Sequence, residues 1–179
     1  MKYLLLSDIH GALPRLEAAL DFYRQQQCDM MLLLGDVLNY GPRNRIPDGI
    51  DAQGVARRLN EMAGDIVAVR GNCDSEVDQM LLDFPILSTC ALLVDNGKRI
   101  LLTHGHVYHP EHLPKGRFDA VIYGHTHVWQ LEKKGSTTFC NTGSITFPKN
   151  GNVPTMGMLD NGVASIFDLS GKLLKQAPI

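Results

Sequence analysis

The stretch Met31-Leu32-Leu33-Leu34-Gly35-Asp36 joins a short apolar run to a glycine and a carboxylate. The run is long enough for one buried strand and too short for a helix. The same arrangement recurs four times, each run being followed by a carboxylate, amide or imidazole: Tyr3–Leu6, Ile66–Val69, Ile100–Leu102 and Ala120–Tyr123. In open α/β sheets the site lies at the carboxyl ends of the strands. We therefore expect these five ends to meet in one site with Asp36 at its centre.

The segments between the first runs indicate helices. The segment that follows Pro14 has apolar residues at spacings of three and four, which predicts an amphipathic helix. Because strands precede and follow it, a right-handed crossover and a parallel pair are expected. A second helix is predicted to end at Gly64, and a third, capped by Asp74 or Ser75, is predicted to end before Pro85.

The second half of the chain has the pattern of antiparallel hairpins. Three pairs of apolar segments flank short turns: Asp95-Asn96-Gly97, Gly135-Ser136 and Asp160-Asn161-Gly162. A βαβ-like first half and an antiparallel second half predict an α/β fold with two mixed sheets packed face to face and helices outside. We expect residues 1–179 to form a single domain, because no linker or repeat divides them.

Composition narrows the function. A net charge of −2 and a pI near 6.4 show no basic excess, so there is no strong nucleic-acid signal and a small substrate is expected. No apolar run approaches the ~20 residues of a membrane span, and the start lacks a signal peptide, so we expect a cytoplasmic protein. The four cysteines form no Cys-x-x-Cys pair, which argues against zinc-finger and thioredoxin-like proteins.

Seven side chains at the strand ends form a candidate metal site. A pair such as Asp8 and His10 is two residues apart, so both side chains leave an extended segment on the same face; His125 and His127 repeat the arrangement. One such pair is a weak signal, and the prediction depends on the coincidence at five strand ends. The complete set is Asp8, His10, Asp36, Asn72, His104, His125 and His127. These ligand types suit Mn, Fe, Zn or Ni better than Ca, and seven exceed the needs of one tetrahedral ion, so two divalent ions are expected.

These motifs resemble the calcineurin-like metallophosphoesterase superfamily, and most of all its small bacterial and archaeal phosphodiesterases of the YfcE type. The resemblance covers Lys2 to about Pro148 and includes five motifs in the family's order: Asp8-x-His10, Gly35-Asp36, Gly71-Asn72-Cys73-Asp74, Thr103-His104-Gly105-His106 and Gly124-His125-Thr126-His127. It implies a four-layer α/β/β/α sandwich with the metals, manganese favoured, at the strand ends.

The resemblance also implies a role for each ligand. Asp8, His10, Asp36 and His127 would hold one ion, and Asp36, Asn72, His104 and His125 would hold the other, with Asp36 bridging. The family mechanism is attack on phosphorus by a hydroxide that bridges the metals, while the ions neutralise the developing charge. Asp36, Asn72 and His104 are therefore the expected catalytic residues.

Cys73 departs from many family members, which carry histidine at this position to protonate the leaving group or bind phosphate. A thiol with a pKa of ~8.5 is a weaker proton donor than an imidazolium and supplies no positive charge. Phosphodiesters, or esters with good leaving groups, are therefore favoured over alkyl phosphomonoesters. The alternative is that Cys73 only packs beneath the metals.

Four residues are candidates for substrate binding: Asn39, Arg43, Cys73 and His106. Arg43 either contacts a phosphate oxygen or is a solvated loop residue, and the second interpretation is favoured. His106 either faces substrate or orients a ligand imidazole. Asn39 binds phosphate or supports its turn.

The main functional hypothesis is a two-metal phosphodiesterase acting on small diesters. The alternatives are a non-catalytic protein-interaction scaffold on the same fold, similar to the retromer subunit of this superfamily, and a phosphomonoesterase or nuclease. The complete ligand set favours the enzyme. Leu81, Leu82 and Phe84 either belong to the core, the default, or form a patch through which the chain associates as a homo-oligomer.

Overall fold

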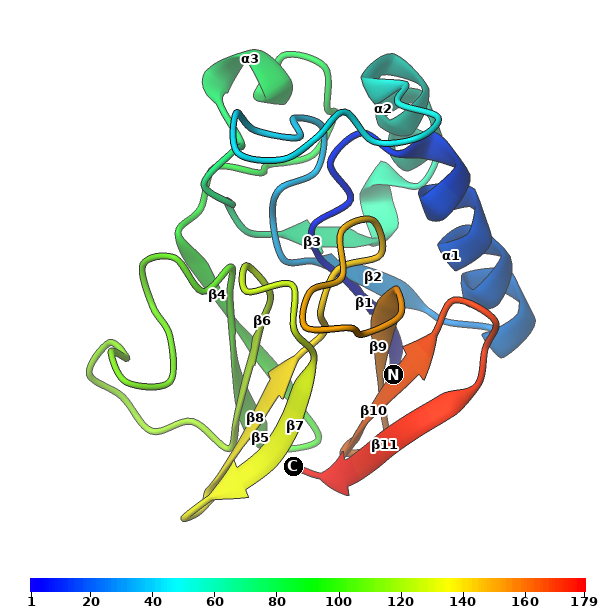
Figure 1. Cartoon of the computed structure of the whole chain (residues 1–179). Coiled ribbons are helices and arrows are strands. Elements are labelled where there is room, and N and C mark those ends of the chain that lie inside the picture. Colours follow the sequence, from blue (N-terminus) through cyan, green and yellow to red (C-terminus); the bar gives the residue numbers. More distant parts are fainter.

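The computed structural model describes all 179 residues, arranged around two mixed sheets (Figure 1). The strands of the first sheet are β1 (Lys2–Leu6), β2 (Met30–Leu33), β3 (Ile66–Ala68), β9 (Thr155–Asp160), β10 (Val163–Asp168) and β11 (Leu173–Pro178). Those of the second are β4 (Cys90–Asp95), β5 (Lys98–Thr103), β6 (Ala120–Tyr123), β7 (Gln130–Lys134) and β8 (Thr137–Asn141). The strand orders are β11-β10-β9-β1-β2-β3 and β4-β5-β6-β8-β7. The predicted α/β class with two mixed sheets is confirmed.

The five apolar runs correspond to β1, β2, β3, β5 and β6. β1, β2 and β3 pair in parallel, with Leu5 opposite Leu32 and Leu32 opposite Val67. β5 and β6 are also parallel. Parallel pairing brings the carboxyl ends of neighbouring strands to the same edge of their sheet. The polar residues that follow these strands are therefore delivered to common edges, as the sequence predicts.

The strands near the centre are buried on both faces. Along β1, Leu4 and Leu6 enter the core beneath the helices, whereas Tyr3 and Leu5 enter the core between the two sheets. Strands buried on both faces read as continuous apolar runs, because neither face tolerates polar side chains. These two cores fix the strand ends on which the site is built.

Two helices, α1 (Leu13–Gln26) and α2 (Ala52–Asn60), cover the outer face of the first sheet (Figure 1). Pro14 lies in the first turn of α1, as predicted. The prediction that Gly64 caps the second helix is wrong: α2 ends at Asn60, and Gly64 lies in a short 3-10 helix, η1 (Ala63–Asp65). None of the helices is long and apolar enough to cross a membrane.

The third helix, α3 (Glu76–Gln79), has only four residues. Ser75 caps it, as one of the two predicted caps, in a capping box with Asp78. The Gln79 side chain donates to the carbonyls of Leu82 and Phe84, and these local bonds replace a further helical turn. Leu82 and Phe84 join the core, as the default interpretation expects, whereas Leu81 is exposed.

The outer face of the second sheet carries a loop where the four-layer sandwich places a helix. Residues 104–119 connect β5 to β6 without a helix (green in Figure 1). Two prolines, Pro110 and Pro114, interrupt the segment and disfavour helix formation. Its Leu113 and Phe118 pack on a small cluster around Tyr123, which covers this face instead.

Candidate metal centre

The loops at the strand ends hold candidate ligands in a strained backbone conformation. Five of the seven candidate ligands have a positive φ: Asp8 (57°), His10 (52°), Asp36 (56°), His125 (69°) and His127 (60°). Residues with a Cβ rarely adopt this region, and such strain concentrates at functional sites. Glycine would remove the strain but would also remove the side chain, so the geometry is consistent with a functional need for carboxylate and imidazole here.

Asp74 joins the loops that follow β2 and β3. Its buried carboxylate accepts backbone N–H groups from Asp36 (2.9 Å), Val37 (2.9 Å) and Gly71 (2.7 Å). The two loops approach so closely that a Cβ on Gly71 would collide with the Asp36 carboxylate. Asp74 therefore sets the position of Asp36 without facing the site. Sequence reasoning considered Asp74 as a helix cap and as part of the motif Gly71-Asn72-Cys73-Asp74, and did not predict these hydrogen bonds.

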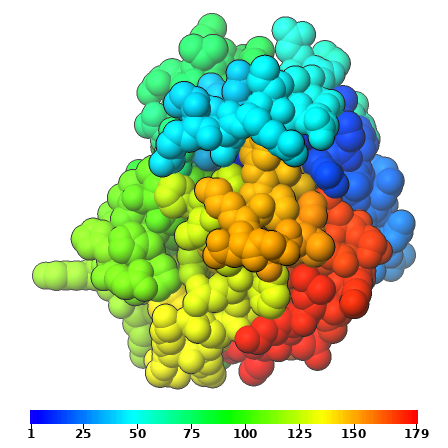
Figure 2. Space-filling model, in the orientation of Figure 1, coloured from blue at the N-terminus to red at the C-terminus, as the bar shows by residue number.

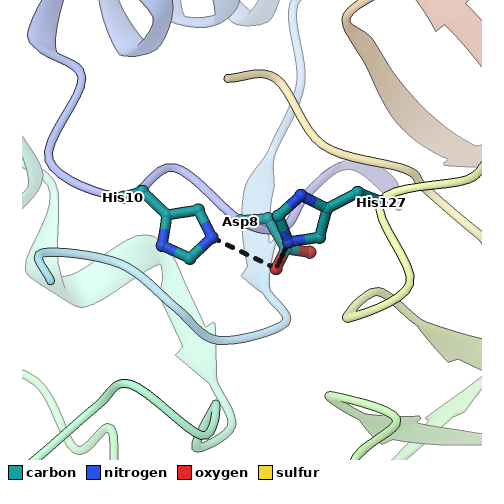
Figure 3. A group of neighbouring side chains, drawn as sticks. All are labelled: Asp8, His10 and His127. Atoms are coloured by element: carbon teal, nitrogen blue, oxygen red, sulfur yellow. Dashed lines mark ion pairs between the residues drawn. The ribbon is translucent and has the colours of Figure 1, made fainter. Parts of the chain in front are cut away.

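One group of candidate ligands consists of Asp8, His10 and His127, whose side chains converge in Figure 3. Asp8 Oδ1 lies 3.1 Å from His127 Nε2 and 3.6 Å from His10 Nε2. The other oxygen, Oδ2, accepts from the Ser7 hydroxyl (2.6 Å) and the His125 backbone N–H (3.0 Å). One oxygen of Asp8 is thus anchored by the protein, and the other faces two imidazoles.

A second group surrounds Asp36. Its Oδ1 accepts the Cys73 N–H at 2.8 Å, and its Oδ2 lies 3.8 Å from His10 Nε2 and 3.6 Å from His104 Nε2. On the far side, Asn72 Oδ1 lies 3.3 Å from His104 Nε2. The Asp36 carboxylate therefore lies between the two groups.

His125 completes the neighbourhood. Its ring centroid is 5.0 Å from that of His104, so it belongs to the same side as Asn72. All seven predicted ligands are thus brought to one place by loops that follow β1, β2, β3, β5 and β6.

Backbone carbonyls orient three of the imidazoles. Nδ1 of His10, His104 and His127 lies 2.8, 2.6 and 2.8 Å from the carbonyls of Asn39, Leu34 and Phe147, respectively. A carbonyl only accepts, so each Nδ1 carries a hydrogen and donates it. In the neutral ring this arrangement leaves Nε2 with a lone pair directed at the carboxylates. This is the usual arrangement of a metal-binding histidine.

Two buried polar atoms at the centre have no hydrogen-bond partner: Asp8 Oδ1 and His10 Nε2. Leaving a buried carboxylate oxygen or imidazole nitrogen without a partner is costly. Carboxylate oxygens that face imidazole lone pairs repel one another unless a cation lies between them. The mixed oxygen and nitrogen donors at this position therefore fit divalent metal ions.

The pKa values show that this centre favours positive charge. Burial acts to raise the pKa of Asp8, but the facing imidazoles of His10 and His127 outweigh it and hold that pKa well below its usual value. Burial acts to lower the pKa of His10, but the neighbouring Asp8 and Asp36 raise it overall. Burial and the charge of His104 lower the pKa of His125 to about 4, so His125 is a neutral donor at pH 7. A metal ion would replace a proton at His10.

Three of the four candidate substrate-binding residues line a cavity of about 690 Å³ over this centre: Asn39, Arg43 and Cys73. The Asn39 side chain accepts the Gly41 N–H at 2.8 Å, and this bond supports the turn. His106 is not in the lining, and its ring lies edge-on to His104 at 5.2 Å. This position fits its alternative role beside a ligand imidazole.

Cys73 is neutral in this environment. Burial and then the nearby Asp36 raise the pKa of its thiol to about 12. Its Sγ accepts from the Asn72 side-chain amide at 3.2 Å. The residue therefore brings neither a positive charge nor a ready proton to the cavity.

Further residues that sequence reasoning missed hold the loops from behind. The Ser144 hydroxyl donates to the Asp8 carbonyl at 2.9 Å, and the Asn141 side chain donates to the Gly124 carbonyl at 2.8 Å. Both belong to the segment Asn141-Thr142-Gly143-Ser144, which lies within the part of the chain that the family resemblance covers. No pattern in one sequence shows which carbonyls these side chains reach.

Comparison with known proteins agrees with this geometry. The family described as the calcineurin-like phosphoesterase superfamily domain matches residues 1–162, so the chain belongs to that superfamily. By sequence, the chain is 48% identical over 171 residues to phosphodiesterase YfcE of Escherichia coli strain K12, with 95% of this chain and 93% of YfcE covered. The solved structure of Yfce, a phosphoesterase from E. coli, has a TM-score of 0.96 at 45% identity and full coverage of both chains. The chain is therefore a hydrolase of the phosphoesterase class.

A more distant structural relative is Vacuolar Protein Sorting 29 of Cryptosporidium parvum. It has a TM-score of 0.69 at 19% identity, with 99% of this chain and 98% of that chain covered. At this identity the likeness shows a shared fold and nothing about activity.

Proposed function

We propose that the chain is a phosphodiesterase that hydrolyses small phosphodiesters with two divalent metal ions, of which manganese is favoured over iron, zinc and nickel. The observation that carries the proposal is the position of Asp36. Its Oδ2 lies within 3.8 Å of His10 Nε2 on one side and 3.6 Å of His104 Nε2 on the other. A single carboxylate between two donor sets is the arrangement that two ions would share. The similarity to proteins named phosphodiesterase supports the choice of substrate class.

The proposed ligands divide at Asp36. Asp8, His10 and His127 lie on one side, and Asn72, His104 and His125 lie on the other. When bound, two such ions would lower the pKa of a water molecule and neutralise charge that develops on phosphate. Asp36, Asn72 and His104 are the residues that we place at the reacting phosphate.

The chain's own residues would keep the centre ordered for this chemistry. Backbone carbonyls hold three imidazoles in one tautomer, and Asp74 fixes the loop that carries Asp36. Such preorganisation reduces the reorganisation needed when charge develops. Cys73, with its raised pKa, adds no cation to the cavity. A diester has one negative charge where a monoester has up to two, so a site with fewer cations suits the diester.

A non-catalytic scaffold on the same fold is the alternative from another functional class. The likeness to Vacuolar Protein Sorting 29 extends to the fold alone. All seven candidate ligand positions are filled here, and their donors converge. A scaffold has no need of strained backbone at five ligand positions, so the enzyme is the better explanation of the geometry.

The test is hydrolysis of bis(p-nitrophenyl) phosphate by protein stripped of metal and then supplied with manganese, iron, zinc or nickel. We expect turnover that chelator abolishes, and slower turnover of p-nitrophenyl phosphate. Asp36→Asn should reduce activity at least about 100-fold, since loss of an ion removes several kcal/mol of charge stabilisation. The exposed Asp83, which lies outside the cavity, provides a control with the same chemical change, Asp83→Asn. Absence of turnover with every ion would contradict the proposal.

A further inference from the structure

A second cavity of about 470 Å³ adjoins the metal centre. Arg43, Asn44 and Lys149 line both this cavity and the one over the candidate ligands. The two cavities therefore lie side by side and share these three residues in their walls. A molecule held at the metal centre is therefore next to the second cavity.

Four cations line the second cavity: Arg15, Arg43, Arg45 and Lys149. The lining contains no aspartate or glutamate. None of the four forms an ion pair, in contrast to Arg58, which pairs with Glu17 at 2.6 Å. Like charges gathered without a carboxylate repel one another, and an anion bound among them would relieve the repulsion.

Three separate segments build this cluster. Arg15 lies in the first turn of α1, Arg43 and Arg45 lie in the loop after β2, and Lys149 lies between β8 and β9. In Figure 2 the cyan segment near residue 45 lies directly against the orange segment near residue 150. The whole chain has a net charge of −2, so this positively charged cluster is a local feature that the net charge does not reveal.

Phe147 connects the cluster to the metal centre. It lines the second cavity, its carbonyl lies 2.8 Å from Nδ1 of His127, and its ring is nearly parallel to the His127 ring at 9°. Phe147, Pro148 and Pro154 also line this cavity. Their apolar side chains can contact the uncharged part of a molecule whose anionic group binds to the arginines.

We propose that the second cavity binds a further phosphate of the substrate, so that the preferred diester carries at least one phosphate besides the one that is cleaved. This inference rests on the proposed function, because it assigns the scissile phosphate to the metal centre. Arginine is well suited to the task, since its planar guanidinium donates two parallel hydrogen bonds to a phosphate.

The experiment compares three activated diesters under manganese. They are p-nitrophenyl thymidine 5′-phosphate, the same compound with an added 3′-phosphate, and the same compound with a 3′-linked thymidylate. Release of p-nitrophenol gives kcat/KM for each. We expect the added phosphate to raise kcat/KM about 10-fold, mainly through a lower KM, and the gain to shrink as salt is added. Calorimetric titration with thymidine 3′,5′-bisphosphate and thymidine 5′-monophosphate should show the same preference in binding.

The double variant Arg15→Gln, Arg45→Gln should reduce the ratio of kcat/KM between the phosphorylated and unphosphorylated substrates to about one-fold. The control is Lys172→Gln, Lys175→Gln, which removes two exposed cations outside both cavities and should keep the ratio. Thermal melts with manganese identify a variant that is not folded, and single variants then replace it.

Each outcome has a distinct meaning. Hydrolysis of bis(p-nitrophenyl) phosphate together with equal kcat/KM values for the paired substrates overturns this inference and leaves the proposed function standing. No hydrolysis of any diester refutes the proposed function, while the calorimetric preference still reports on the cavity. A further gain in kcat/KM for the 3′-linked thymidylate over the 3′-phosphate would indicate a nucleic-acid strand and would also overturn the inference.

Discussion

Glycine is expected to be better tolerated than alanine at position 125, which is the reverse of the usual order. His125 has a φ of 69°, where a residue with a Cβ costs roughly 1–2 kcal/mol. Both His125→Gly and His125→Ala remove the imidazole, and both keep the backbone N–H that donates to Asp8. Glycine avoids the steric cost and loses roughly 0.5–1 kcal/mol in chain entropy. The glycine variant should therefore be the more stable of the two by about 0.5–1 kcal/mol.

The assay is thermal unfolding in the presence of chelator, so that loss of a metal ligand does not enter the comparison. For a chain of this length the difference corresponds to about 1–4 °C in Tm. His106 provides the control, because its φ is not positive. There, His106→Gly should be less stable than His106→Ala by roughly 0.5–1 kcal/mol. If glycine is the less stable residue at both positions, the strained loop is not a property of the folded protein and this reasoning is refuted.

Three further results are expected. Removal of metal should lower Tm by about 5–10 °C, since an ion present at 100 times its Kd contributes about 2.7 kcal/mol to the free energy of unfolding. Thermal melts with and without chelator measure the shift in Tm, and an unchanged Tm would contradict the prediction. Asp74→Ala leaves three backbone N–H groups without their acceptor and should weaken manganese binding about 10- to 100-fold, as measured by titration with the metal. An unchanged affinity would show that Asp74 does not position Asp36. In metal-free protein, the rate of alkylation of Cys73, whose pKa is raised to about 12, should increase about tenfold for each pH unit between about 8 and 10. A rate that levels off near pH 9, as for an ordinary thiol, would disprove the raised pKa.

The site was predictable from the sequence because each candidate ligand follows a recognisable apolar strand. Each apolar run is buried on both faces, so it reads as a strand, and the polar residue that follows it marks the strand end. The turns Asn96-Gly97 and Asn161-Gly162 have positive φ at both residues, as the hairpin prediction requires. These local patterns were sufficient to predict that the candidate ligands lie at one site.

Features that depend on tertiary contacts escaped prediction. β11 (Leu173–Pro178) is an edge strand with mostly exposed side chains, so its sequence lacks a clear alternating pattern, and Pro178 is tolerated there because an edge strand leaves donors unpaired. The role of Asp74 depends on backbone groups from two loops. The basic cavity combines Arg15 with Arg43 and Lys149, which are far apart in the chain, and a net charge cannot show such a cluster.

In the proposed function, the Asp36 carboxylate lies between two metal ions. Anomalous diffraction from crystals grown with manganese tests it directly. We expect two peaks ~3.5–4 Å apart, one near Nε2 of His10 and the other near Nε2 of His104, with Asp36 Oδ2 bound to both ions. A single peak, or none among the seven candidate ligands, would contradict it.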